Sequence, residues 1–485
     1  MGMGETAQSA SNVAPLGLLF LAVMVIMIWR ARREQALFPL LITTCYMPLG
    51  QEFVVAGLNL QFIRILILAG WLRVVARGEF RDFRLTPLDK LFLWWSAVTV
   101  VLGTLAEPGM SRFINRSGLA FNALGSYFLV RCWVRDFDDV LRGVRFVSLM
   151  IVPLALSMIV EKFTARNIFS VFGGVPELTQ LRDGTLRCQG AFRHPILAGT
   201  YGATLFPVFV GLYFTVPREK RRALLGAGSA AIVTLSAGSS GALLAFLAGC
   251  GGLMLWRMRH NMRLIRWSVV AMIGLLALVM KAPVWYAIGR LSEVVGGTGW
   301  YRSHIIDQAI RHFDEWWLVG STYTAHWAPG GEVVAADPNN MDIINHYVAE
   351  GLGGGIVKLA LFVTMIVLCF RIVGRWVREL DDTVLRPAAF LVWSLGACLF
   401  AHCISFFSVS YFDQIVIMYY WLLAVIASLG LVLESRRWAL AAQDSAAFPA
   451  DPNLQGAEAA PGLAEPATLN LNSAVKVAAS KGLRE

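Results

Sequence analysis

Histidine is the side chain best suited to proton transfer near neutral pH, and the seven histidines of this 485-residue chain are unevenly placed. Six of them map to one side of the apolar segments, or to the half of a segment nearest that side: His194, His304, His312, His326, His346 and His402. Glu52, Arg64 and Arg116 also lie near those ends of apolar segments. A charge at membrane depth is unfavourable unless it faces water or a partner. The grouping therefore predicts a polar site at one surface, the alternative being that each side chain reaches the interface separately.

Arg302 is the arginine whose position most clearly suggests a binding site for an anion. The segment Tyr301–Leu318 has the spacing of an amphipathic helix lying on the membrane or on the bundle. Its apolar face carries Ile306, Ala309, Ile310, Phe313 and Trp317, and its polar face carries His304, Asp307, Arg311 and Asp314. Arg302 points to the apolar side near the helix N-terminus, where a phosphate would satisfy both the guanidinium and the free N–H groups. The alternative is a frayed first turn with a solvated Arg302.

The elements that must position these residues are predicted to be membrane-spanning helices. Hydrophobic residues make up 57% of the chain and charged residues 15%, with a mean hydropathy of +0.60. Apolar runs near the length that crosses the hydrocarbon core recur along it. They are Leu16–Trp29, Leu37–Ala56, Leu60–Ala76, Leu88–Leu105, Phe113–Val134, Val140–Val160, Pro195–Val216, Ala223–Ala237, Gly241–Trp256, Trp267–Met280, Tyr347–Val373, Ala388–Phe407 and Ile415–Leu433. The predicted fold class is all-α, a polytopic transmembrane helical bundle of about 12–13 spans.

The formal net charge of +10 is distributed as a topology signal. Arginine and lysine cluster in alternate loops, and the short loops between them carry none, which is the positive-inside pattern. This predicts a bacterial inner-membrane protein with a periplasmic N-terminus and a cytoplasmic C-terminus, and it argues against a nucleic-acid partner. The first apolar stretch lacks the basic region and cleavage site of a signal peptide.

The domain prediction follows from these spans. Residues 1–440 form one transmembrane domain with two long outer loops, 161–193 and 281–345. Residues 441–485 are rich in Ala, Pro, Gly and Glu, and predict a disordered cytoplasmic tail. The seven cysteines form no disulfide framework or CxxC spacing. No metal-binding, nucleotide-binding or hydrolase motif is present, so neither a metal nor a cofactor is indicated. The glycines of Gly351–Gly355 predict close helix packing.

Three stretches resemble the O-antigen ligase and polymerase superfamily, which includes exopolysaccharide and capsule polymerases. The first is Arg187-Cys-Gln-Gly-Ala-Phe-Arg193-His194-Pro195, followed by Gly199. The second runs from Tyr301-Arg302 to Trp317-Leu-Val-Gly320, and the third is Asp342-Ile-Ile-Asn345-His346-Tyr347 before the glycine stretch. The resemblance covers roughly Leu88–Leu433. Two departures are Ser239-Ser240-Gly241 in place of Ser-Arg-Gly, and Asn345-His346 in place of His-Asn.

The resemblance implies glycosyl transfer from a polyprenyl-pyrophosphate-linked glycan at the outer face, without a metal or cofactor. Arg302, with Arg193 or Arg187, would bind the leaving pyrophosphate. Arg116, His194 and Asn345 complete the candidate binding residues, although His194 would equally satisfy backbone groups at a helix start. His346 would be the general base, with the Asp342 carboxylate beside it at helical i, i+4 spacing. The alternative is that His346 and Asn345 only cap the loop–helix junction.

Three functions remain open at this stage. The favoured one is a polymerase that extends a surface polysaccharide, with a glycan acceptor, membrane lipid and a chain-length regulator as partners. A ligase would instead transfer the finished glycan to a lipid A core or a protein. A transporter or flippase of lipid-linked oligosaccharide is the alternative from another class, and it should place charges near the membrane midplane.

Overall fold

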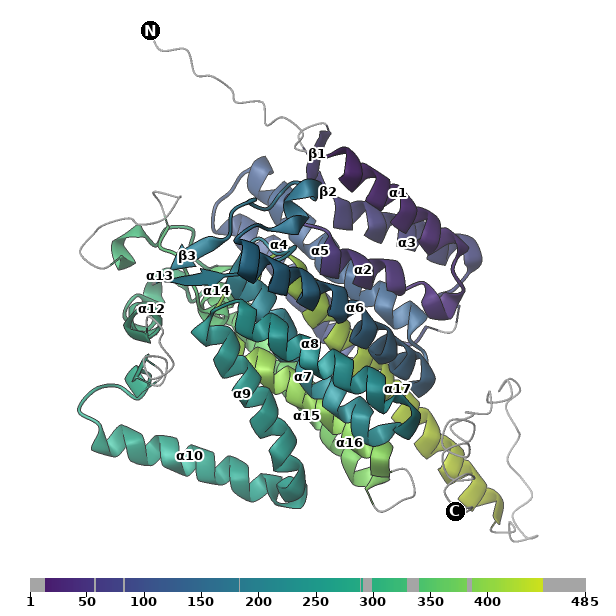
Figure 1. Ribbon diagram of the computed structural model, residues 1–485. Coiled ribbons are helices and arrows are strands. Elements are labelled where there is room, and N and C mark those ends of the chain that lie inside the picture. The colour runs from purple at the N-terminus through teal and green to yellow at the C-terminus, as the bar shows by residue number, and fades with distance from the viewer. Residues whose placement is uncertain are drawn as a thin grey trace.

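The computed structural model of the chain describes residues 14–55, 58–81, 83–182, 184–287, 289–290, 299–328, 340–381 and 386–447. The fold is almost entirely helical (Figure 1). Its helices are α1 (Pro15–Arg30), α2 (Phe38–Tyr46), α3 (Phe62–Arg77), α4 (Pro87–Leu105), α5 (Met110–Trp133), α6 (Phe137–Thr164), α7 (Pro195–Thr215), α8 (Lys220–Ser236), α9 (Ser240–Met254), α10 (Met262–Val279), α12 (Gly299–Arg311), α13 (Phe313–Trp316), α14 (His346–Leu352), α15 (Gly355–Leu380), α16 (Arg386–Ser405) and α17 (Gln414–Ala447). Two antiparallel hairpins, β1 (Glu52–Val55) with β2 (Leu58–Gln61) and β3 (Gln180–Arg182) with β4 (Thr185–Arg187), are its only strands in the described residues.

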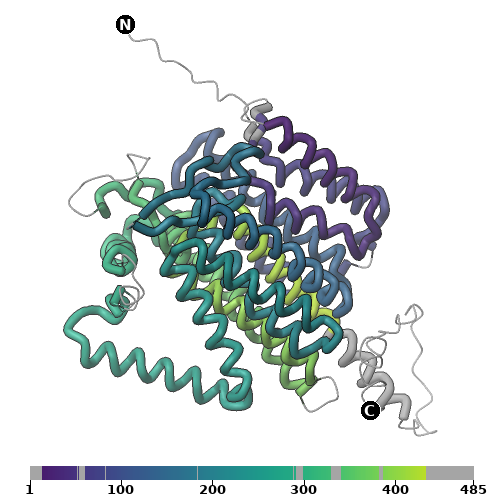
Figure 2. The backbone as a smooth tube through the Cα atoms, viewed as in Figure 1, coloured from purple at the N-terminus to yellow at the C-terminus, as the bar shows by residue number. Residues whose placement is uncertain are grey.

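The prediction of a polytopic helical bundle is confirmed. Seven helical segments of the described chain are long and apolar enough to cross a membrane. The centre of the bundle is made by α7, which packs against α8, α9 and α16, and by α17, which packs against α5 and α15. Figure 2 shows the α17 segment running through the bundle between these helices. By contrast, α10 leaves the foot of α9 and lies apart from the bundle, with none of its side chains buried (Figure 1).

Three predicted segments differ from the structure. The predicted span Leu37–Ala56 is wrong, because α2 ends at Tyr46 and the chain continues into β1. Met47 is extended, as expected for a residue that precedes a proline (φ −100°, ψ 116°). The predicted span Tyr347–Val373 is divided into α14 and α15. At the C-terminus, α17 continues to Ala447, since an alanine-rich segment readily extends an existing helix. The rest of the predicted tail, 448–485, lies outside the described residues.

Gly355, in the predicted glycine stretch, and Gly320, which packs against the α14–α15 junction, allow close packing of backbone segments. Gly320 and Gly355 both have positive φ (95° and 70°), and the space of a β-carbon at each is taken by a backbone carbonyl, that of Leu352 and of Leu318 respectively. The Ile356 N–H donates to the Trp317 carbonyl at 2.8 Å, and the Ser321 N–H to the Leu352 carbonyl at 3.0 Å. These contacts dock the segment after α13 against the α14–α15 junction, which fixes where α12 lies.

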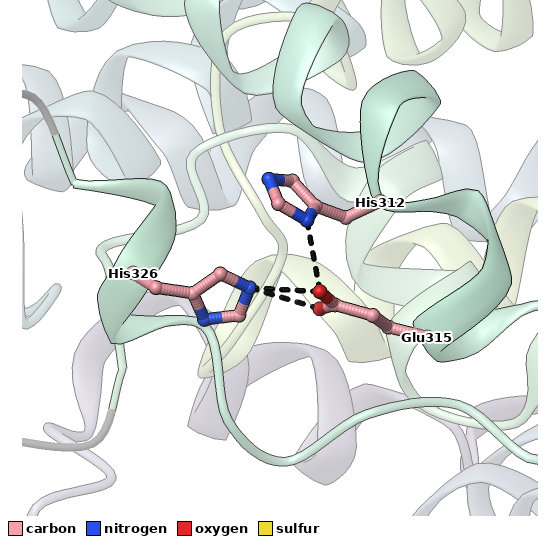
Figure 3. Close-up of side chains that lie close together, drawn as sticks. All are labelled: His312, Glu315 and His326. Carbon is pink, nitrogen blue, oxygen red and sulfur yellow. Dashed lines mark hydrogen bonds and ion pairs between the residues drawn. The ribbon is translucent and has the colours of Figure 1, made fainter.

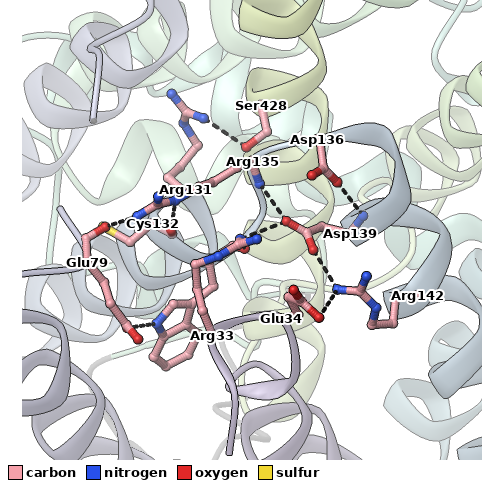
Figure 4. Close-up of polar contacts among 11 residues, drawn as sticks. Arg33, Glu34, Glu79, Arg131, Cys132, Arg135, Asp136, Asp139, Arg142 and Ser428 are labelled. Carbon is pink, nitrogen blue, oxygen red and sulfur yellow. Dashed lines mark hydrogen bonds and ion pairs between the residues drawn. The ribbon is translucent and has the colours of Figure 1, made fainter. Parts of the chain in front are cut away.

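The two ends of the bundle differ in charge. At one end, here called the arginine end, the side chains of Figure 4 tie together the turn η1 (Arg33–Gln35), α5, α6 and α17. Asp139 accepts from Arg33 and Arg142, each at 2.7 Å, and Arg131 donates to Ser428 Oγ at 2.8 Å. Arg131 is also paired with the buried Asp89 at 3.0 Å. The predicted cytoplasmic arginines of several loops therefore meet at one end.

The opposite end, here called the loop end, carries both hairpins, α12 to α14 and the α16–α17 connection, residues 406–413 (Figure 1). Backbone hydrogen bonds join these loops. The Cys188 N–H donates to the Ser236 carbonyl at 3.1 Å, and the His346 N–H to the Phe406 carbonyl at 2.7 Å. The long and short loops that the sequence assigns to one side thus share one end of the fold.

Candidate functional site

Arg302 and Arg187 border the same turn, residues 236–240 between α8 and α9. Arg302 lies on the first turn of α12 and donates from Nη2 to Ser240 Oγ at 3.5 Å. Arg187 ends β4, and its Cγ would lie 3.2 Å from a β-carbon added at Gly238. Both arginines are buried, with 5% and 6% of their surface exposed, and burial lowers the pKa of Arg302. The fold thus holds two arginine side chains, which the sequence places 115 positions apart, beside one turn.

The predicted amphipathic helix presents a different face from the one expected. Ile305 and Ala309 are buried together with Arg302, whereas Ile310, Phe313 and Trp317 are exposed. The helix also breaks at His312, where α12 gives way to α13. Most of the predicted apolar face is therefore exposed, and a different face of the helix packs on the bundle. Arg302 lies on the packed face, so the alternative of a solvated Arg302 is wrong.

His194 satisfies a helix start, as one of the two sequence-based interpretations proposed. It is the N-cap of α7, and its Nδ1 accepts the Ile196 N–H at 3.2 Å. Desolvation, with smaller contributions from Arg187 and Arg182, lowers the pKa of His194 to about 4. His194 is therefore neutral near pH 7, and it lies within the electrostatic field of Arg187.

Arg193 differs from the other two predicted arginines because its side chain is exposed. Its backbone N–H donates to Asp413 Oδ2 at 3.2 Å. Asp413, which the sequence motifs did not single out, sits in a left-handed conformation (φ 65°) just before α17. Burial raises its pKa to about 7, and the bond from Arg193 only partly offsets this. The loop end therefore holds a carboxyl group that titrates near neutral pH.

His346 lies in a buried polar cluster at the start of α14. Its Nδ1 accepts the Tyr411 N–H at 3.2 Å, and its Nε2 lies 3.8 Å from Glu350 Oε1. Rings of Phe406 and Tyr411 pack against the imidazole, with centroids 4.9 and 5.3 Å away. Desolvation lowers the pKa of His346 to about 4, with Glu350 opposing and Lys358 reinforcing the shift. A small cavity beside it is lined by aromatic side chains, including Trp95 and Tyr420.

Glu350 connects this cluster to two further helices. Its Oε2 accepts from Trp95 Nε1 at 2.6 Å and lies 3.4 Å from Lys358 Nζ. Lys358, for which the sequence suggested no partner, is thereby paired. Arg116 lies within electrostatic range of Glu350. Its Nε would lie 3.0 Å from a β-carbon added at Gly103, with the Gly353 carbonyl 3.1 Å from the same point.

Two predictions about the α14 start have different outcomes. Asn345 is the N-cap of α14, and its side chain accepts the Val348 N–H at 3.2 Å. The predicted i, i+4 pairing of Asp342 with His346 is wrong, because α14 begins at His346 and Asp342 precedes it in an irregular segment. Tyr301 Oη donates instead to the Asp342 carbonyl at 2.9 Å. The carboxylate four residues from His346 in the helix is that of Glu350.

The connection between α16 and α17 links these groups. Ser408 Cβ would lie 2.7 Å from a β-carbon added at Gly241, one residue after the Ser240 that Arg302 contacts. Further along, Tyr411 bonds His346 and Asp413 bonds Arg193. The turn beside the arginine pair and the His346 cluster therefore both contact one short loop.

A separate cluster contains His312, Glu315 and His326 (Figure 3). Glu315 Oε1 lies 2.8 Å from His312 Nδ1 and 3.0 Å from His326 Nε2. Hydrogen bonds from the two imidazoles hold the pKa of Glu315 below its usual value, outweighing desolvation. Its spacing, H-x2-E-x10-H, matches no standard metal motif, so only the fold brings the three together.

In comparisons with known proteins, no family model and no curated protein matches this chain.

Proposed function

We propose that this chain is a membrane glycosyltransferase that polymerises lipid-linked repeat units of a surface polysaccharide. The donor would be a polyprenyl-pyrophosphate-linked glycan, and the acceptor another glycan. The observation that carries the proposal is the placement of Arg302 and Arg187, both buried, beside the turn at 236–240. Two of the three stretches that resemble the O-antigen ligase and polymerase superfamily contribute these arginines, the first through Arg187 and the second through Arg302.

Two buried guanidiniums suit a pyrophosphate leaving group. Negative charge grows on the pyrophosphate as the glycosidic bond to it breaks, and fixed cations in a water-poor site stabilise that charge most. Guanidinium binds phosphate oxygens in a bidentate manner, which also fixes orientation. The lowered pKa of Arg302 is the electrostatic sign that this cation is held away from water. A docked dianion would relieve that unfavourable burial.

The acceptor hydroxyl must lose a proton, for which the loop end offers two candidates. The resemblance assigns this role to His346. Its pKa of about 4 makes it a weak base, and its Nδ1 is already engaged by the Tyr411 N–H. Asp413 has a pKa of about 7, which matches a base working near neutral pH, and it bonds the residue next to His194. We therefore propose Asp413 as a second candidate base, with His346 positioning the loop that carries it.

Two alternative functions, a ligase and a flippase, are compared with the proposed polymerase. A ligase that transfers the finished glycan to a lipid A core or a protein would use the same donor chemistry. The order Asp342-x-x-Asn345-His346-Tyr347 favours the polymerase, with a chain-length regulator as a further partner. A flippase would need charges near the midplane reachable from both ends. The arginines that support our proposal instead lie at the loop end.

The proposed location is the bacterial inner membrane, with the loop end in the periplasm. The meeting of Arg33, Arg131 and Arg142 at the opposite end supports a cytoplasmic arginine end, since basic loops are retained on that side. The N-terminus would then be periplasmic and the C-terminus cytoplasmic.

The test is reconstitution of the purified chain with synthetic polyprenyl-pyrophosphate repeat units. Arg302→Ala should abolish polymer formation, and Arg302→Lys should recover little of it, because an ammonium cannot replace the bidentate fork. Arg311→Ala is the matched control: Arg311 lies on the same helix, is exposed and pairs with Asp307 at 2.8 Å. Equal folded yield and full turnover in Arg302→Ala would refute the proposal.

A further inference from the structure

The His312–Glu315–His326 cluster has the donor set of a transition-metal site. It offers two imidazole nitrogens and one carboxylate, whose ligand atoms all lie within 4.8 Å of one another. Each side chain is about one-third exposed, which leaves the cluster open to an ion from solution. Imidazole with carboxylate is a common ligand set for Zn²⁺ and its first-row neighbours, whereas Mg²⁺ and Ca²⁺ prefer oxygen ligands alone.

The distances suit a small tetrahedral ion after a slight adjustment. Zn–N and Zn–O bonds of about 2.0–2.1 Å place neighbouring tetrahedral ligands roughly 3.3 Å apart. Glu315 Oε1 lies 2.8 Å from His312 Nδ1 and 3.0 Å from His326 Nε2, as hydrogen bonds require. Small side-chain rotations would open these two contacts enough for an ion and shorten the remaining separation, since all three ligand atoms lie within 4.8 Å of one another. Each ligating nitrogen must be unprotonated, so the proton of each neutral imidazole moves to its other ring nitrogen.

The surrounding side chains already hold the ligands in place. Trp327 stacks on the His312 ring, with centroids 5.7 Å apart, and Tyr323 stacks on the His326 ring at 5.3 Å. Trp327 Nε1 also donates to Glu315 Oε2 at 3.4 Å. Such outer contacts fix ring orientation in metal sites and raise affinity. The three ligands therefore converge from a supported framework.

We propose that His312, Glu315 and His326 bind one divalent transition metal ion, with Zn²⁺ the best match. The ion would clamp the junction of α12 and α13 to the turn η5 (Ala325–Trp327). His312 lies ten residues after Arg302, roughly 15 Å along a helix. The ion therefore acts as a structural clamp for the helix that carries Arg302. It takes no part in the proposed glycosyl transfer itself.

Binding is measured on the full chain, purified in detergent with an affinity tag that lacks histidine and stripped with EDTA. Zn²⁺ is titrated by calorimetry, and the thermal midpoint is followed with and without Zn²⁺, Mg²⁺ or Ca²⁺. The variants are Glu315→Gln and the double change His312→Ala with His326→Ala. The matched control is His260→Ala, a histidine that pairs with Asp381 at the arginine end.

Wild type and His260→Ala should bind one Zn²⁺ per chain and show a higher thermal midpoint with Zn²⁺ alone. Glu315→Gln should bind at least about tenfold more weakly, and the double variant should not saturate. Glu315→Gln keeps a hydrogen-bonding side chain of the same size, so a fold defect is distinguishable from a lost ligand. Absence of saturable Zn²⁺ binding to wild type, or equal binding by the double variant, overturns the proposal. Donor-dependent turnover tests glycosyl transfer separately, because Arg302→Ala should leave Zn²⁺ binding unchanged.

Discussion

The backbone N–H of Tyr411 donates a hydrogen bond to Nδ1 of His346 at 3.2 Å, and this contact joins the α16–α17 connection to the start of α14. Because Nδ1 accepts this bond, the neutral imidazole carries its proton on Nε2, which faces Glu350 at 3.8 Å. The bond requires an unprotonated Nδ1, so protonation of His346 would remove it.

The stability of the chain should therefore depend on His346 at acid pH. Its pKa of about 4 in the folded protein lies below the ordinary value near 6.5, so the unfolded chain binds more protons between these values. The stabilisation is fully present above about pH 6.5 and is lost as pH falls toward 4, by at most about 3 kcal/mol. Thermal midpoints at pH 7.5, 6, 5 and 4.5 should fall less steeply in His346→Gln than in wild type. Parallel pH profiles would show that His346 does not cause the loss.

The identity of the base should be visible in the pH dependence of turnover. If Asp413 accepts the proton, turnover falls as pH drops through about 7, because its carboxyl group becomes protonated. Asp413→Asn should then lower turnover about 10²–10⁴-fold with donor binding retained. If His346 is the base, wild-type turnover should stay level until about pH 4. A level profile with an active Asp413→Asn variant would return the role to His346.

Arg187 should matter more than Arg193 for donor binding. Arg187 is buried beside Gly238, whereas the Arg193 side chain is exposed and its backbone N–H makes the contact with Asp413. Arg193→Ala keeps that N–H, so near-normal turnover is expected. Arg187→Ala should weaken donor binding by at least tenfold, since one charge-assisted hydrogen bond contributes about 1.5–3 kcal/mol. The reverse order in a donor-binding titration would restore Arg193 to the phosphate-binding role expected from the sequence.

Substitutions of Glu350 and Lys358 should have strongly non-additive effects on the free energy of unfolding. Both side chains are buried, and their atoms lie 3.4 Å apart. Lys358→Met leaves the Glu350 charge uncompensated and should destabilise the chain by about 3–5 kcal/mol. Adding Glu350→Gln should recover much of that loss, because the neutral amide still accepts from Trp95. Additive losses in chemical unfolding of the two single variants and the double variant would contradict this pairing.

The orientation of the bundle is tested with reporter fusions. Alkaline phosphatase folds only outside the cytoplasm, so a fusion after Gly330, which lies outside the described residues, should be active. A fusion after Arg221, at the start of α8, should be inactive. Activity in the Arg221 fusion would place the arginine end in the periplasm and remove the site from the proposed face.

By itself the sequence determined which segments are helices and which ends of these helices carry the arginines. Apolar runs such as Pro195–Val216 correspond closely to helices such as α7, because a segment in lipid must satisfy its own backbone hydrogen bonds. The positions of Arg302, His194 and Asn345 at helix starts were also readable, since capping and helix periodicity are local properties. The predicted span Leu37–Ala56 missed a local signal, because Met47 precedes Pro48 and is extended.

Only the tertiary structure decided which of these residues meet. Arg187 and Arg302 border one turn, and Tyr411 reaches His346, through packing between segments far apart in the chain. The pairing of Lys358 with Glu350, in place of Asp342 with His346, depended on where α14 begins. Asp413 and the His312–Glu315–His326 cluster carry no motif, because their chemistry arises from burial and proximity. Neither property is local in sequence, and both follow from how the helices pack.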